Sequence, residues 1–248
     1  MTQPQARVGL IIPSSNRNVE QEMVPAYPAE VKAHVTRLRM TGPHHTTLAK
    51  LLPRIQEAAG ALADAKCDVV AFHCTGTAMQ EGPSGEAAIR DALRAGAHER
   101  ITTTASAVVH ALHALEARKI VLVTPYDQQT TDDEVAFLQA AGFDVLSALA
   151  SDRGGSDGTC YTPSAFWFDT VRTQHNPEAD VYFLSCANIS TFPVIEEIEQ
   201  RLARPVVTSN QAVIFDALSL LGIADRRNCF GRVFDRLRQA EAAHRIPA

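Results

Sequence analysis

The chain has 248 residues, of which 46% are hydrophobic and 21% are charged, and its formal net charge is −5. This negative balance gives no basic surface for nucleic acid, and the longest apolar runs fall short of the roughly 20 residues that a membrane span needs, so we expect neither partner. The N-terminus leads into a predicted strand without a signal-peptide pattern, and we expect a cytoplasmic protein.

The first half of the chain alternates short apolar runs, typical of buried strands, with helical patterns. After the first strand, Ser14 or Ser15 either caps the next helix or faces a crevice, and Asn16 can project its amide there. The predicted elements are strand 8–13, a helix start at 19–23, an outer strand 31–38, helix 48–62, a strand ending at Cys74, helix 82–95, strand 101–105 and helix 106–115.

The second half repeats this alternation. Its predicted elements are strand 120–124, helix 132–141, strand 143–149, helix 163–173, a strand ending at Cys186, helix 192–202, a strand and turn at 204–211, helix 214–221 and a charged, exposed tail. The glycine-rich segment 151–158 is predicted to be a mobile loop and a lid over the site. No Lys-Ser/Thr pair follows its glycines, so they do not form a phosphate cradle.

Strands that alternate with helices throughout predict an α/β protein with doubly wound parallel sheets. Two landmarks share one offset, because Cys186 follows Cys74 at the same interval at which Pro125 follows Pro13. We therefore predict two pseudo-symmetric halves with the active site in the cleft between them. The first half is residues 1–117, completed by segment 207–248, and the second is residues 118–206.

Cys74 and Cys186 each stand where an apolar strand ends, at the edge of a parallel sheet that faces the ligand crevice. The peptide N–H groups that follow are predicted to lie at a helix N-terminus, an environment that lowers a thiol pKa and binds carboxylates. These groups belong to Thr75, Gly76, Ala187 and Asn188. A thiolate and a thiol on opposite faces of a substrate can add at one carbon and move a proton.

The other three cysteines, Cys67, Cys160 and Cys229, are predicted to be small buried hydrophobic residues. Five cysteines without a disulfide spacing suit a reducing compartment. No Cys-x-x-Cys pair or His-Glu-x-x-His helix is present, and we expect no metal site.

Five further positions allow both a functional and a structural interpretation. The Tyr126 phenol is predicted to donate to a carboxylate rather than only to pack. Strand alternation sends His73 away from the face of Cys74, so we expect a structural histidine. His44 and His45 are predicted surface residues, and Arg17 either attracts an anionic substrate or is an exposed cation near a helix start.

Five ordered motifs together resemble the aspartate/glutamate racemase superfamily, and most closely its branch of maleate cis–trans isomerases and arylmalonate decarboxylases. They span nearly the whole chain: Pro13-Ser-Ser-Asn16, the Cys74 strand, Thr124-Pro-Tyr126, Leu184-Ser-Cys186 and Val207-Thr-Ser-Asn-Gln-Ala212. The resemblance implies two Rossmann-like halves, a site between them, and no cofactor or metal.

By this resemblance Cys74 is the nucleophile and Cys186 the second cysteine, which acts as acid or base. Asn16 and Tyr126 match positions that hold substrate carboxylates, and Thr75 matches a hydroxyl that stabilises an enediolate. Arylmalonate decarboxylases keep only the second cysteine, so Cys74 argues against that activity.

The expected function is cofactor-independent isomerisation of a small dicarboxylate, maleate to fumarate, through a Cys74 adduct and an enediolate. The alternatives are a two-thiol amino-acid or hydantoin-type racemase, an arylmalonate-type decarboxylase, and a two-lobed small-molecule binding protein without catalysis. We also expect a homo-oligomer, either a dimer or a tetramer.

Overall fold

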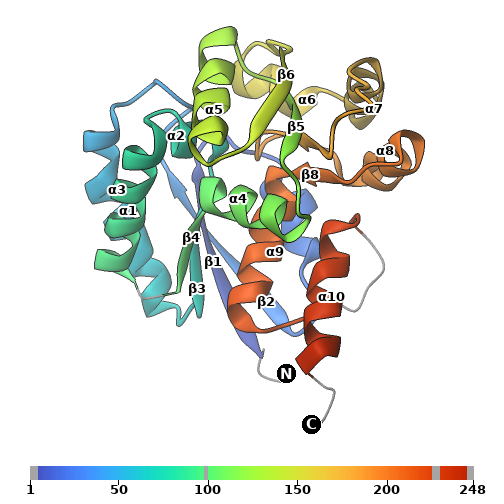
Figure 1. The fold of residues 1–248 in the computed structure, drawn as a ribbon. Coiled ribbons are helices and arrows are strands. Elements are labelled where there is room, and N and C mark those ends of the chain that lie inside the picture. The colour runs from blue at the N-terminus through green and yellow to red at the C-terminus, as the bar shows by residue number, and fades with distance from the viewer. Residues whose placement is uncertain (1–4, 98–99, 225–229, 245–248) are drawn as a thin grey trace.

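The computed structural model describes residues 5–97, 100–224 and 230–244. It contains two four-stranded parallel sheets with the same strand order, shifted by four strands (Figure 1). The first sheet is β2 (Val31–Leu38), β1 (Ala6–Pro13), β3 (Val69–Phe72) and β4 (Ile101–Thr103). The second is β6 (Asp144–Ala150), β5 (Lys119–Thr124), β7 (Val181–Leu184) and β8 (Val206–Thr208). The predicted fold class is confirmed.

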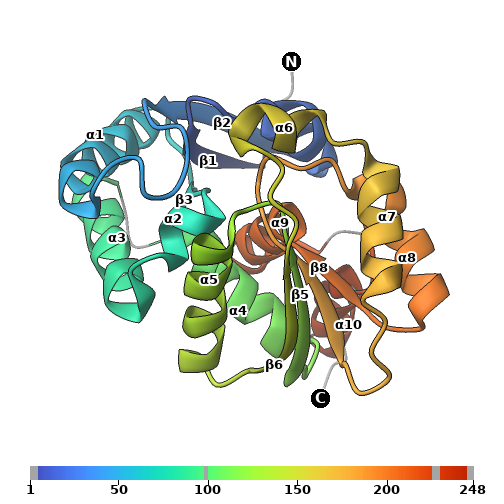
Figure 2. The same ribbon diagram turned by 90° about the horizontal axis from the view of Figure 1, so that it is seen from above.

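Helices cover both sheets, and two of them lie between the sheets (Figures 1 and 2). α1 (Leu48–Asp64) and α3 (Gly82–Gly96) pack together on the first half, and α7 (Ser164–Thr173) packs on α8 (Ile195–Leu202) in the second. α4 (Thr104–Ala114) and α9 (Ser209–Leu221) pack on each other and contact both β4 and β8. The proposed completion of the first half by segment 207–248 stays a prediction, and the contacts of α9 with β3 and β4 favour it.

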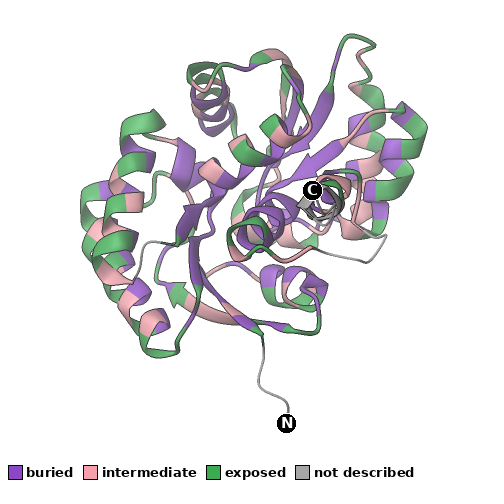
Figure 3. Ribbon diagram, turned by 60° about the horizontal axis from the view of Figure 1, so that its bottom comes forward, coloured by how far each residue is buried: buried purple, intermediate pink, exposed green. Residues whose placement is uncertain are grey.

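The central strands are buried on both faces, which explains their continuous apolar sequences (Figure 3). In β5, Ile120 and Leu122 join the large core that includes α4 and α9. The alternate residues Val121 and Val123 join a second core under α7 and α8. The two halves therefore share one continuous hydrophobic core.

The sequence repeat has a structural basis in two equivalent aspartates. Asp68 accepts a hydrogen bond from the Arg7 N–H at 2.7 Å, and Asp180 accepts one from the Lys119 N–H at 2.8 Å. Asp180 follows Asp68, and Lys119 follows Arg7, at the same interval that separates the two cysteines. Each aspartate ties the amino end of a cysteine-bearing strand to the first strand of its half.

Several predicted boundaries were wrong because polar residues cap helices earlier than expected. Asp127 caps α5 (Gln128–Ala140), which begins before the predicted helix at 132. Thr208 and Gln211 form a capping box, so Ser209 opens α9 where a turn was predicted. The helix start at 19–23 is a single π-helical turn, η1 (Val19–Met23), followed by the 3₁₀ turn η2 (Val24–Ala26).

The predicted exposed tail contains α10 (Val233–His244), whose Val233 and Phe234 side chains are buried. Cys229 lies outside the described residues. Within those residues no helix has both the length and the apolar character to cross a membrane.

Candidate active site

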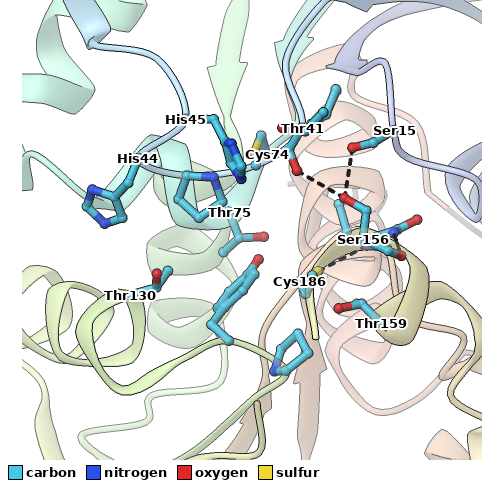
Figure 4. A pocket seen from close by; sticks show the side chains of 18 of the residues that line it. Ser15, Thr41, His44, His45, Cys74, Thr75, Thr130, Ser156, Thr159 and Cys186 are labelled. Carbon is cyan, nitrogen blue, oxygen red and sulfur yellow. Dashed lines mark hydrogen bonds between the residues drawn. The ribbon is translucent and has the colours of Figure 1, made fainter. Parts of the chain in front are cut away.

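A pocket of about 370 Å³ opens at the carboxyl ends of the strands, with walls from both halves (Figure 4). Cys74 and Cys186 both line it, one from each half. The structure brings together in this pocket seven of the predicted site residues: Asn16, Cys74, Thr75, Tyr126, Cys186, Ala187 and Asn188.

Gly76 is the predicted site residue that does not line this pocket. A Cβ atom added to it would lie 3.0 Å from Pro43 and 3.2 Å from the Thr130 methyl group. Both neighbours are in the pocket wall, so Gly76 permits close packing behind that wall.

Cys74 precedes α2 (Thr75–Met79), as predicted, and its thiol lies 3.3 Å from the Thr77 hydroxyl. The Thr75 hydroxyl donates to Ser209 Oγ at 2.8 Å. Ser209 Oγ also accepts the Cys186 N–H at 3.0 Å. Ser209 was not predicted as a site residue. It bonds to Thr75, the residue after Cys74, and to the backbone N–H of Cys186, and so links the two cysteine-bearing segments.

Cys186 has a different local structure, and the prediction of a helix directly after it was wrong. A turn follows, and the next helical element is the 3₁₀ turn η3 (Phe192–Val194). The Asn188 N–H nevertheless donates to Cys186 Sγ at 3.3 Å. The backbone at Cys186 has φ of 113°, a left-handed value that a non-glycine residue adopts only when its surroundings enforce it.

Burial raises the pKa of both thiols, so the expected lowering at a helix N-terminus is wrong. Hydrogen bonds from Thr77 offset this only partly at Cys74. Burial raises the pKa of Cys186 to about 12, although hydrogen bonds from Tyr126 and the Asn188 N–H act in the opposite direction. Within the part of the chain that the structure describes, no lysine or arginine lines this pocket to favour a thiolate. Both thiols therefore carry protons at neutral pH.

Tyr126 follows β5 and forms a hydrogen bond with Cys186. Burial raises the pKa of its phenol well above 10, and negative charge on Cys186 would raise it further. The phenol therefore keeps its proton at neutral pH and can donate a hydrogen bond, and its donation to a substrate carboxylate stays a prediction.

The two asparagines of the site are held by the protein itself. Asn16 Oδ1 accepts the N–H groups of Asn18 and Val19, and its Nδ2 donates to the Ala187 carbonyl, which leaves one N–H for a ligand. Asn188 accepts the Arg17 N–H and donates to the Ser156 carbonyl. Each of the two amides uses one N–H in these bonds and keeps the other for a substrate carboxylate.

Part of segment 151–158 is helical, contrary to prediction, because α6 (Gly155–Tyr161) begins within it. Its Ser156 hydroxyl contacts the Ser15 hydroxyl at 2.9 Å and the Thr41 carbonyl at 3.0 Å (Figure 4). An added Cβ at Gly158 would lie 1.5 Å from the Arg153 carbonyl oxygen, so only glycine fits there. This helix joins the second half to the first at the pocket, the position expected of a lid.

Arg17 does not line this pocket. Its guanidinium pairs with Asp157 and lies over the Tyr161 ring, both on α6. Cys160, also on α6, is only half-buried and donates weakly to Asn18 at 3.8 Å. Cys67, by contrast, is buried in the core as expected.

The histidines have the predicted exposure, but two of them lie at the pocket, which was not predicted. His73 is fully buried between Thr104 and Asn210, and burial lowers its pKa to about 4, so it is a neutral structural residue as expected. His44 and His45 are exposed as predicted, but both line the pocket. Their loop follows the carboxyl end of β2. Ligands bind at the carboxyl ends of parallel strands, so this position in the sequence could have indicated that they lie at the site.

Among the described residues, no three His, Cys, Asp or Glu side chains gather as a metal site. The side chains that line the pocket offer two protonated thiols, a phenol, hydroxyl groups, amides, the two imidazoles of His44 and His45, and the carboxyl groups of Asp127 and Asp152.

Sequence comparison places the chain among known proteins. The sequence model of the arylmalonate decarboxylase family matches residues 8–234. The chain belongs to this family. The resemblance inferred from the five motifs is thereby confirmed.

Relatives within the family have two different activities. Maleate isomerase of Nocardia farcinica is 29% identical over 227 residues, covering 88% of this chain and 90% of that protein. Arylmalonate decarboxylase of Bordetella bronchiseptica is 31% identical over 170 residues, covering 67% and 71%. The solved structure of N. farcinica maleate cis–trans isomerase with a cysteine replaced by serine holds a covalently bound succinylcysteine intermediate. That structure superposes with a TM-score of 0.85 at 28% identity, covering 94% of this chain and 98% of that one.

Proposed function

We propose that this chain is a cofactor-independent isomerase that converts maleate to fumarate, with Cys74 as nucleophile and Cys186 as acid and base. The observation that carries the proposal is the pair of thiols in one pocket, with one from each half. The N. farcinica relative supports it, because a cysteine adduct of a four-carbon dicarboxylate has been captured in that enzyme.

The raised thiol pKa values define the first step. As Cys74 Sγ bonds to one alkene carbon, its proton passes to an oxygen of the far carboxylate. The π electron pair moves toward that carboxylate and forms an enediolate. Charge is conserved, and no resting thiolate is required. The Cys74 thiol is therefore a nucleophile whose proton is taken by the substrate.

The remaining steps isomerise the adduct. The former double bond is now single and rotates, after which the electron pair re-forms it, the C–S bond breaks and the sulfur recovers its proton. A proton from Cys186 to the enediolate carbon gives a succinyl adduct, and its return regenerates the enediolate. Cys186 thereby acts as a general acid and then as a general base towards the intermediate.

Neutral donors stabilise the enediolate in place of cations. The Tyr126 phenol and the free N–H of Asn16 are directed to this pocket. The first N–H groups of a helix lack intrahelical partners, so that of Thr75, which opens α2 and lines the pocket, is a further donor. One preorganised donor of this type contributes roughly 3 kcal/mol to transition-state stabilisation.

Proton NMR of the enzyme with maleate in deuterated buffer tests the proposal. We expect the maleate signal to be replaced by that of fumarate. Deuterium at the vinyl carbons would show that Cys186 protonates the adduct at carbon. Unchanged maleate would refute the isomerase. Solvent exchange in an amino acid, or loss of CO₂ from an arylmalonate, would then identify a racemase or the family's decarboxylase activity.

Cys186→Ser is expected to lose most turnover and to accumulate a covalent adduct on Cys74. A serine hydroxyl is a far weaker acid than a thiol, so the proton needed to leave the adduct state moves slowly. Intact-protein mass spectrometry after incubation with maleate would show a mass increase of one maleic acid, and peptide mapping would place it on Cys74. The same adduct on Cys186 in wild type would reverse the two roles.

The proposal includes a homo-oligomer in the cytoplasm. Free thiols in the active site suit a reducing compartment. Light scattering of the purified enzyme would measure its mass, and a monomer would contradict the oligomer.

A further inference from the structure

Two glutamates, the partly buried Glu22 and the buried Glu134, contact the segment that carries Cys186. On α5, Glu134 Oε1 accepts the Ser185 hydroxyl at 2.9 Å, directly before Cys186. On η1, Glu22 Oε1 accepts the N–H groups of Thr191 and Phe192 at 3.0 and 2.9 Å. Glu134 follows Glu22 at the same interval that separates the two cysteines. The two glutamates are therefore equivalent positions of the pseudo-symmetric halves.

Glu134 is fully buried, and its second oxygen has no hydrogen-bond partner. No basic side chain among the described residues forms an ion pair with it. A buried carboxyl oxygen without a partner lowers stability, so its presence calls for an explanation. Glu22 shares this feature, and Glu134 is distinguished by its full burial and by its direct contact with the residue before Cys186.

The second oxygen of Glu22 is unpartnered as well, and the two glutamates differ in the donors that their first oxygens accept. After Cys186 no helix forms at once, and the free N–H groups of Thr191 and Phe192 bond to Glu22. After Cys74 the chain forms α2, and the Gln80 N–H bonds to the Gly76 carbonyl inside that helix. α5 packs against α2. Glu134 contacts Ser185 of its own half instead.

We propose that Glu134 is a positioning residue for Cys186: its carboxyl group fixes Ser185, and with it the left-handed backbone that presents the Cys186 thiol to the pocket. The inference rests on the proposed function in giving Cys186 a role in catalysis. Ser185 is also fixed through its N–H, which donates to Val123 in β5 at 2.9 Å. The backbone of Ser185 is therefore already bonded to β5, and Glu134 fixes the orientation of its side chain.

The charge of Glu134 is part of this role. Burial raises its pKa to about 8, so it is mostly neutral at pH 7. If ionised, it would raise the pKa of Cys74, Cys186 and Tyr126 and so oppose negative charge in the pocket. A neutral acid can hold Ser185 without that effect.

Few other charges act at this position. On α5, Asp133 raises the Glu134 pKa further. α2 carries no charged side chain, and Asp144 of β6 is exposed. The charged residues of α3 engage one another or α4 and β4: Glu86 with Thr103 and Ser106, Arg90 with Glu86, and Arg94 with Asp91. The titratable groups that face Glu134 are therefore the two thiols and Tyr126.

Steady-state kinetics of four variants tests the positioning role. Ser185→Ala and Glu134→Ala are expected to lower kcat on the order of tenfold with little change in KM, and the double variant to be no slower than either. Glu134→Gln keeps a hydrogen-bond acceptor for Ser185 and is expected to retain kcat near pH 7. Glu57→Ala, at an exposed position of α1 away from the pocket, is the control with unchanged kcat. Wild-type kcat in Ser185→Ala would overturn the proposal, even if Glu134→Ala fails to fold.

Thiol alkylation tests the same inference without isomerase activity. The rate of Cys186 modification by iodoacetamide, mapped by mass spectrometry across pH, reports its ionisation. We expect Glu134→Gln to react at lower pH than wild type, because the anion beside the thiols is gone, and Glu22→Gln to match wild type. An unchanged profile in Glu134→Gln would refute the charge argument. If the enzyme proved inactive on maleate, this measurement would still decide the role of Glu134.

Discussion

Cys74→Ala is expected to reduce maleate turnover by roughly 10³-fold or more while leaving the protein folded. The nucleophile is removed, and the remaining pocket can bind the substrate but cannot form the C–S bond. The thiol contacts the Thr77 hydroxyl and is buried, so its loss creates a small cavity that costs about 1 kcal/mol of stability. Stopped-assay measurement of fumarate and thermal unfolding would check the two effects separately.

Cys67→Ala is the matched control for this variant. Cys67 is also a buried cysteine, 2% exposed, but it packs in the core near Gly9 and Leu62 and does not line the pocket. We expect a similar loss of stability with an unchanged kcat. Full activity in Cys74→Ala would refute the covalent mechanism, and loss of activity in both variants would attribute the effect to the fold.

The fold was predictable because the chain repeats itself. The shared offset of the cysteines and prolines predicts two equivalent halves, and the aspartate contacts of Asp68 and Asp180 repeat at the same interval. Continuous apolar runs predict strands buried on both faces, and the cores on each side of β5 confirm them. A parallel sheet then places strand-end residues at one edge, which is why Cys74 and Cys186 line one pocket.

The rest depends on contacts that a linear pattern does not contain. The sequence repeats a cysteine at a strand end, but only Cys74 is followed by a helix. Ser209 sits one residue after a capping threonine, and its contact with both Thr75 and Cys186 requires α9 to lie between the sheets. The thiol pKa values depend on burial, which outweighs the N–H donors that sequence reasoning identified.

Glu22 and Glu134 show how symmetry in sequence can support asymmetry in chemistry. Glu22 and Glu134 occupy equivalent positions, yet Glu22 accepts backbone N–H groups while Glu134 accepts a single hydroxyl. Glu134 follows Glu22 at the same interval at which Cys186 follows Cys74. The sequence alone could therefore have identified the two glutamates as equivalent positions. Their different partners arise from the folding of the segments after each cysteine.

Glu134→Gln is expected to make the protein more stable, and the gain should grow with pH. The folded-state pKa of about 8 exceeds the usual value of 4.5, so between these values the folded state binds more protons than the unfolded state. Stability from this group is therefore fully present below about pH 4.5 and is lost as pH rises toward 8, at about 1.4 kcal/mol per unit. Glutamine has no such dependence. Its unpartnered NH₂ group offsets part of the gain, and we expect about 1–2 kcal/mol at pH 7.

Urea unfolding of wild type and Glu134→Gln at about pH 5 and about pH 8 measures this difference. The exposed Glu57→Gln on α1 is the control, with the same chemical change and an expected stability difference that does not vary between the two pH values. An equal difference for Glu134→Gln at both pH values would show that the carboxyl group is ionised in the folded protein. A pH-dependent gain combined with an altered thiol profile would show that this site sacrifices stability to keep a neutral acid beside the thiols.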